Sequence, residues 1–158
     1  MLDLIIKNGQ SYINGELKNV DVAIKNGKIQ QIGQITEEAK EIVDAEKKIV
    51  LPGCIDTQTH FREPGSTDTE DLHSGSRAAI VGGITSVFEM PNTNPPTSNK
   101  TEFQRKLDLA KNRMYCNYAF YFGATADNAK DLASLKNLVG CCGTVSYTHL
   151  TLPTTPYV

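Results

Sequence analysis

The residues best suited to chemistry in this chain lie in one short stretch, residues 51–65. The stretch predicts a buried strand that Pro64-Gly65 stops. Because successive side chains of a strand point to opposite faces, four polar or ionisable groups share one face. They are Asp56, Gln58, His60 and Arg62. Such a face makes a poor core but suits a site for a metal ion or an anion, and the alternative is a half-buried strand with a solvated face.

The elements around this strand predict α/β architecture. A helix is expected over 69–81, a strand over 84–90, a second helix from Asn99 and a strand over 116–122. Asp127 or Asn128 is expected to cap a third helix, whose buried face would be Leu132, Leu135 and Val139. Strands that alternate with helices are typical of βα units and a parallel sheet.

Residues 1–52 predict a small antiparallel β module. Its turn signals are Asn8-Gly9, Asn14-Gly15 and Asn26-Gly27, because both residues of Asn-Gly tolerate positive φ. Alternation through Val20, Val22 and Ile24 indicates a strand with one buried face.

Composition excludes several function classes. The chain has 158 residues and a formal net charge of −2, without a basic block, so we expect no nucleic-acid partner. The first residues predict neither a signal peptide nor a membrane span, and the expected compartment is the cytoplasm. Cys54, Cys116, Cys141 and Cys142 lack zinc-clip spacing and are interpreted as buried, reduced thiols.

The last segment, 144–158, continues neither periodicity. Back-translated, residues 145–154 can be written base for base as the transposon-end adapter of sequencing libraries. We therefore interpret 144–158 as a non-native tail, which would leave His149 without a ligand role.

Five motifs in order resemble the amino-terminal third of a dihydroorotase of the amidohydrolase superfamily. They are Pro52-Gly53, the run from Asp56 to Gly65, Gly75-Ser76-Arg77-Ala78-Ala79, Gly82-Gly83-Ile84-Thr85 and Met90-Pro91-Asn92-Thr93. The resemblance implies that residues 53–143 form the first three βα units of a TIM-type (β/α)8 barrel, with the site at the strands' C-terminal ends.

The resemblance also implies a zinc site of one or two ions. His60 occupies the family's second metal-histidine position, and Gln58 stands where the first is expected. A glutamine oxygen suits zinc less well than imidazole does. The family's metal-bridging lysine, its other histidines and its catalytic carboxylate would lie beyond residue 143.

Arg62 and Asn92 match the family positions that hold the substrate carboxylate. The alternatives are an ion pair of Arg62 with Glu63 or Glu70 and a turn-capping role for Asn92. The implied reaction is reversible ring opening of dihydroorotate to N-carbamoyl-L-aspartate in pyrimidine synthesis.

Two other functions remain open. Gln58 could mark a non-catalytic dihydroorotase-like scaffold subunit, or the chain could belong to another cyclic amidohydrolase, such as an allantoinase. The resemblance implies a homodimer for the full-length protein and aspartate transcarbamoylase as a further partner. The isolated chain is expected to be inactive and poorly soluble, because open strand edges remain.

Overall fold

A computed structural model describes residues 1–146 of the chain. The chain divides into two compact units, Met1–Pro52 and a second that begins at Gly53, and each is described by itself. Most of the proposed tail, including His149, lies outside the described residues. Within 1–146, no helix is long and apolar enough to cross a membrane.

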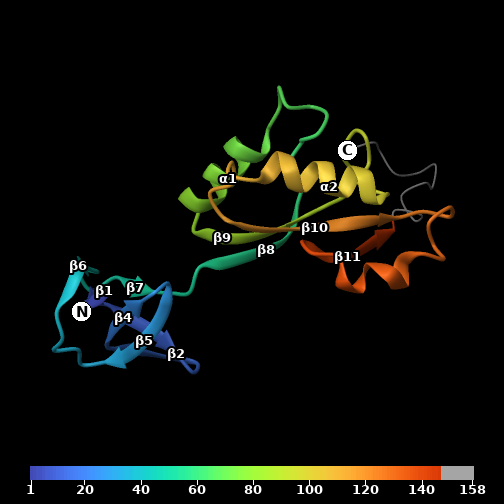
Figure 1. The fold of residues 1–158 in the computed structure, drawn as a ribbon. Coiled ribbons are helices and arrows are strands. Elements are labelled where there is room, and N and C mark those ends of the chain that lie inside the picture. The colour runs from blue at the N-terminus through green and yellow to red at the C-terminus, as the bar shows by residue number, and fades with distance from the viewer. Residues whose placement is uncertain (147–158) are drawn as a thin grey trace. The chain divides into compact units, whose positions relative to one another are not determined.

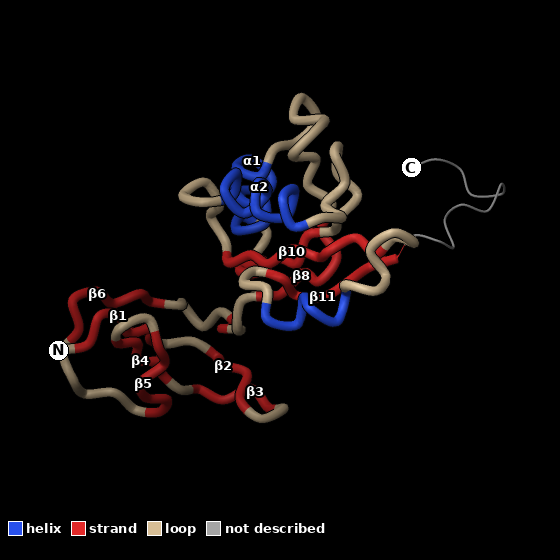
Figure 2. The backbone as a smooth tube through the Cα atoms, turned by 45° about the vertical axis from the view of Figure 1, so that its right-hand side comes forward, coloured by secondary structure: helices blue, strands red, loops and turns tan. Residues whose placement is uncertain are grey.

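The first unit consists of two small sheets, ordered β5-β4-β1-β6 and β3-β2-β7 (Figure 2). Its strands are β1 (Leu2–Lys7), β2 (Gln10–Ile13), β3 (Glu16–Asn19), β4 (Asp21–Lys25), β5 (Lys28–Gly33), β6 (Ala39–Asp44) and β7 (Ile49–Val50). Asn14-Gly15 and Asn26-Gly27 form the predicted hairpin turns, with positive φ at all four residues. Asn8-Gly9 instead joins strands of different sheets.

The prediction of an antiparallel module is only partly right. β6 pairs with β1 in parallel and β7 pairs with β2 in parallel, because the chain crosses to a distant strand instead of turning back. The prediction of one buried face on β4 is also incomplete. Val22 and Ala23 are both buried, since β4 is an inner strand of its sheet.

The second unit is a four-stranded parallel sheet in the order β11-β10-β9-β8. Its strands are β8 (Cys54–Thr59), β9 (Ile84–Glu89), β10 (Asn117–Ala124) and β11 (Cys141–Ser146). Helices α1 (Leu72–Val81) and α2 (Lys100–Ala110) lie side by side against this sheet (Figure 1). Each strand is thus hydrogen-bonded to the next one in the sequence, as predicted for consecutive βα units.

The fourth strand, β11, was not predicted. It pairs with β10 through Phe122↔Thr144 and Ala124↔Ser146, so it extends past the proposed boundary at residue 143. Thr144 and Val145 are β-branched and favour a strand. Assigning residues from 144 onward to the tail divided this strand and concealed it, and the adapter origin of the tail stays a prediction.

The predicted third helix is wrong in type. The segment contains a short 3₁₀-helix, η1 (Leu132–Asn137), in which Leu135 is buried, while Val139 is 85% exposed. Asn128 does not cap it. Its side-chain oxygen accepts from the Thr125 amide at 2.8 Å, and its nitrogen donates to the Gly123 carbonyl at 2.9 Å. Asn128 therefore organises the loop after β10.

Helix α2 begins after the predicted Asn99, whereas α1 begins at Leu72, three residues after its expected start at residue 69. Asp71 caps α1 in a capping box with Ser74, and the Asn99 side chain caps α2 by accepting from the Glu102 amide at 2.8 Å. Between helices and sheet lies an apolar core. It includes Leu72, Val87, Phe103, Phe120 and Phe122.

Two burial predictions fail. Within residues 1–146, β8 is an edge strand that pairs only with β9, so Ile55 is 59% exposed instead of buried. Among the cysteines, which are all free thiols, Cys116 is buried, but Cys54 is exposed and Cys141 and Cys142 are half-buried.

Gly75 is required by the packing of α1 on the loop after β8. A Cβ at Gly75 would lie 2.5 Å from Phe61 Cδ1, so we expect Gly75→Ala to lower the free energy of unfolding by about 1–3 kcal/mol in urea titrations. Gly82→Ala, at the end of the same helix, is the control. Its Cβ would find ordinary contacts at 3.5 Å, and an equal loss there would contradict the steric explanation.

Candidate functional site at the ends of β8 and β9

The C-terminal ends of β8 and β9 are tied together by two hydrogen bonds. The Met90 amide donates to the Thr59 carbonyl at 2.9 Å, and Thr59 Oγ1 donates to the Phe88 carbonyl at 3.2 Å. The residues that follow Thr59 and Met90 therefore enter the same small region at the edge where barrel enzymes place their sites.

His60 and Asn92 meet in this region. His60 Nδ1 and Asn92 Oδ1 are 2.9 Å apart. An amide oxygen only accepts hydrogen bonds, so His60 Nδ1 carries a proton, and in the neutral ring Nε2 then has the lone pair. This is the tautomer in which an imidazole can bind a metal through Nε2. The Asn92 side chain therefore faces the histidine instead of capping a turn.

Gln58 and Asp56 depart from the predicted polar face. The β8–β9 register shifts between Asp56 and Thr59, and Asp56 Oδ1 accepts from the Gln58 amide at 2.9 Å. β8 ends at Thr59, so His60 and Arg62 lie in the following loop. The four side chains thus do not form one continuous strand face, and the Gln58 side chain is exposed.

Arg62 is half-buried and makes no hydrogen bond or ion pair with the described residues. The alternative for Arg62, an ion pair with Glu63 or Glu70, does not form within residues 1–146, and the Glu63 carboxylate binds Arg113 instead. The positive charge of Arg62 does act on Glu89. It partly opposes the rise in the pKa of the Glu89 carboxyl that burial causes.

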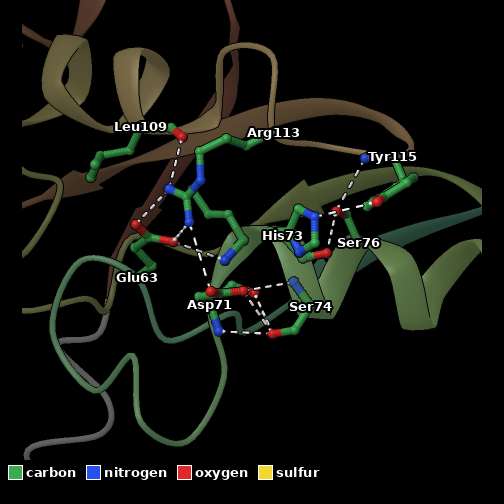
Figure 3. A network of polar contacts seen from close by, with 9 residues as sticks. Glu63, Asp71, His73, Ser74, Ser76, Leu109, Arg113 and Tyr115 are labelled. Atoms are coloured by element: carbon green, nitrogen blue, oxygen red, sulfur yellow. Dashed lines mark hydrogen bonds and ion pairs between the residues drawn. The ribbon is translucent and has the colours of Figure 1, made fainter.

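Glu63 is a buried carboxylate that points toward Arg113 (Figure 3). It binds Arg113 through both oxygens, at 2.7 and 3.0 Å, and Oε2 also accepts from the Leu72 amide at 3.0 Å. The bond to Glu63 raises the pKa of the Arg113 guanidinium. The sequence analysis did not predict this role. The position of Glu63, between the candidate site residue Arg62 and the Pro64-Gly65 turn, could have indicated that it supports the loop.

The polar network continues along α1 (Figure 3). The Ser74 amide and hydroxyl lower the pKa of the Asp71 carboxyl, whose carboxylate lies 3.8 Å from Arg113. Ser76 Oγ accepts from the Tyr115 amide at 3.1 Å. These contacts fix the start of α1 against the segment that follows α2, and through Glu63 they fix the loop that carries Arg62.

The loop after β9 is braced on both sides. The Asn94 amide donates to the Pro64 carbonyl at 2.9 Å, which joins this loop to the loop after β8. The Thr97 amide donates to the Pro91 carbonyl at 3.0 Å, and the Gly123 amide donates to the Thr97 carbonyl at 2.8 Å. Asn92 is therefore presented from a loop that is held at both ends.

Glu89 and Lys106 form an ion pair that is completely buried. Burial raises the pKa of Glu89 to about 8, although the positive charges of Lys106 and Arg62 oppose the shift. Burial also lowers the pKa of Lys106. Sequence analysis missed the pair, although Lys106 follows Phe103 at helical spacing on the face that packs against the sheet.

The described residues supply only part of a metal site. Within residues 1–146, no group of three His, Cys, Asp or Glu side chains is placed to hold a metal ion. A zinc site needs three or four protein ligands. His60 fits such a site through its Nε2, and Gln58 offers a weaker oxygen, so these residues do not complete one.

A parallel sheet in sequential order, with a histidine and an amide at its C-terminal edge, is the arrangement that consecutive strands of a βα barrel have. Residues 49–142 match the model of the amidohydrolase family, which is more than half of the chain. The chain belongs to the amidohydrolase family.

Within this family, the chain is similar to curated relatives and solved structures that are named as allantoinases and hydantoinases. Over 142 residues the chain is 42% identical to an allantoinase of Escherichia coli (strain SMS-3-5 / SECEC), covering 89% of this chain and 31% of that protein. It superimposes on an L-hydantoinase (dihydropyrimidinase) from Arthrobacter aurescens with a TM-score of 0.83 and 30% identity, over 91% of this chain and 32% of that one. A D-hydantoinase structure gives a TM-score of 0.76 and 31% identity.

These comparisons support the expected family, and not dihydroorotase itself. The chain spans about a third of the length of the relatives it matches. The amidohydrolase part of the resemblance is confirmed, and the names that accompany it are allantoinase and hydantoinase.

The Glu63–Arg113 contact yields a stability prediction. We expect Glu63→Gln to lower the free energy of unfolding by about 2 kcal/mol, because a buried, charge-assisted bidentate contact is weakened. The measurement is urea unfolding followed by circular dichroism. Arg105→Lys is the matched control, since its contact with Glu102 is exposed and 3.4 Å long, and it should change stability by less than about 0.5 kcal/mol. Equal losses would show that Glu63 has no special structural role.

Proposed function

We propose that this chain is part of a hydrolase that opens a cyclic amide or ureide ring, with allantoin as the first candidate substrate. The observation that carries the proposal is the 42% identity to Escherichia coli allantoinase over 142 residues. In such a reaction water cleaves a ring C–N bond, and the carbonyl carbon becomes a carboxylate while the nitrogen is released as an amino or ureido group.

The residues at the edge of β8 and β9 suit separate parts of this chemistry. We propose that His60 is one zinc ligand through Nε2. Asn92 Oδ1 would fix the tautomer of the ring by accepting a hydrogen bond from Nδ1. A bound zinc would supply polarisation of the ring carbonyl and activation of water. The remaining ligands and the proton-transfer group would have to come from outside residues 1–146.

Dihydroorotate is the second candidate substrate, and Arg62 favours it. Dihydroorotate carries a carboxylate on its ring, whereas allantoin carries none. A half-buried guanidinium that makes no ion pair within residues 1–146 suits such a carboxylate. This is also the arrangement that the resemblance of the His60–Gly65 and Met90–Thr93 motifs implies.

Assays on a protein that contains these residues and has the length of the relatives would test both candidates. With zinc supplied, we expect ring opening of allantoin, followed by release of the carboxylate product. Turnover of dihydroorotate alone would overturn the allantoin assignment in favour of the second candidate. If no cyclic amide is opened and Gln58→His restores turnover, the result would support the scaffold alternative.

Arg62 separates the two substrates. We expect Arg62→Ala to raise KM for dihydroorotate roughly 10- to 100-fold, because a charge-assisted contact is lost, and to change KM for allantoin much less. Steady-state kinetics on both substrates provides the measurement. Arg77→Ala, an exposed residue of α1, is the control and should alter neither value. Equal effects of Arg62→Ala on both substrates would contradict carboxylate binding.

Asn92 should affect metal binding. We expect Asn92→Ala to weaken zinc affinity roughly 10- to 100-fold, because the partner that orients a metal-binding histidine is removed. Competition with a zinc-sensitive dye measures the affinity. Asn94→Ala is the matched control from the same loop, since Asn94 contributes its backbone amide to the Pro64 carbonyl and the substitution retains that bond. An unchanged zinc affinity in Asn92→Ala would rule out a role of Asn92 in orienting His60.

A further inference from the structure

A buried lysine lies behind the end of β9. Lys106 of α2 and Glu89, the last residue of β9, have no solvent exposure. The Lys106 ammonium pairs with Glu89, donates to the Met90 carbonyl at 3.1 Å and lies 5.1 Å from the centre of the Phe120 ring. Burying two charges is costly, and apolar residues of similar size commonly serve a core equally well. Packing alone therefore does not account for the pair.

The carbonyl that Lys106 binds belongs to a residue held from two directions. Met90 donates its amide to the Thr59 carbonyl, at the end of β8, while its own carbonyl accepts from Lys106. His60 directly follows Thr59, and Asn92 lies two residues after Met90. The Lys106 contact therefore fixes the point from which the Asn92 loop departs.

Glu89 holds the ammonium in this place. Its carboxylate is the partner of Lys106, and within residues 1–146 neither of its oxygens receives a further hydrogen bond. Without Glu89, the lysine would have a single carbonyl and a ring face to compensate for its burial. The two side chains thus act as one unit, with Glu89 placing Lys106 and Lys106 placing Met90.

We propose that Lys106 and Glu89 are positioning residues, which hold the start of the loop after β9 so that Asn92 meets His60. Their relevance to catalysis rests on the function proposed above, but the positioning itself does not. The pair makes no hydrogen bond or ion pair with His60 or Asn92, and it acts through the Met90 backbone.

The test compares two variants of this chain, Glu89→Gln and Glu89→Gln/Lys106→Met. In the first, the amide oxygen still accepts from Lys106, so the contact with Met90 should remain. In the second, no charge is buried and no donor reaches Met90. We expect amide hydrogen exchange at Met90 and Thr97 to be roughly tenfold faster in the double variant than in Glu89→Gln.

A second readout reports the geometry at His60 directly. The ¹⁵N resonances of its ring, recorded above the pH at which imidazole is protonated, distinguish a proton on Nδ1 from one on Nε2. We expect Glu89→Gln to keep the Nδ1–H form and the double variant to show a mixture of both forms. A merely structural loss of core packing would not shift this tautomer.

Phe103→Leu is the matched control, because Phe103 is equally buried on α2 and does not contact Met90 through a hydrogen bond. It should speed exchange evenly, including at Phe120, whose amide donates to the Gly140 carbonyl. Even acceleration in the double variant, or an unchanged His60 tautomer, would overturn the proposal. If the double variant does not fold, Glu89→Leu/Lys106→Met replaces it with an apolar pair and is held to the same two outcomes. Neither readout uses turnover, so a failed substrate assignment would leave this test unaffected.

Discussion

The pairing of β8 with β9 is the constraint on which the candidate site depends. Parallel strands end at the same edge of a sheet, and the Met90 amide closes this edge by donating to the Thr59 carbonyl at 2.9 Å. One residue beyond Thr59 is His60, and two beyond Met90 is Asn92. Two residues 32 positions apart in the sequence therefore meet at 2.9 Å because the backbone brings them there.

The residues from His60 to Glu63 have two different roles. His60 and Arg62 lie where a ligand could reach them, whereas Phe61 packs against Gly75 and Glu63 binds Arg113. The alternation expected of a strand thus persists into the loop, although β8 itself ends at Thr59. Phe61 and Glu63 therefore support the loop and are not part of the candidate site. A polar side chain in this motif, such as Glu63, is thus not necessarily a site residue.

Local signals predicted most of the second unit, and long-range packing accounts for what was missed. The Asn99 cap depends on Glu102 three residues later, so the sequence alone locates the start of α2. The cap of α1 at Asp71 was not predicted, and that helix begins at Leu72 instead of residue 69. The exposure of Ile55 depends on β8 being an edge strand, which no local pattern reveals. The buried Lys106 likewise has its partner on another element, and a charged residue on a helix is ordinarily assigned to the surface.

Gln58 is the weaker of the two candidate metal ligands. Its backbone amide is held by Asp56, so the chain direction at this position does not depend on the Gln58 side chain. The Gln58 side chain is exposed next to the end of β8, so a histidine there would have room for its ring. Because imidazole binds zinc better than an amide oxygen does, Gln58 would be the weaker ligand of the proposed zinc site and His60 the stronger one.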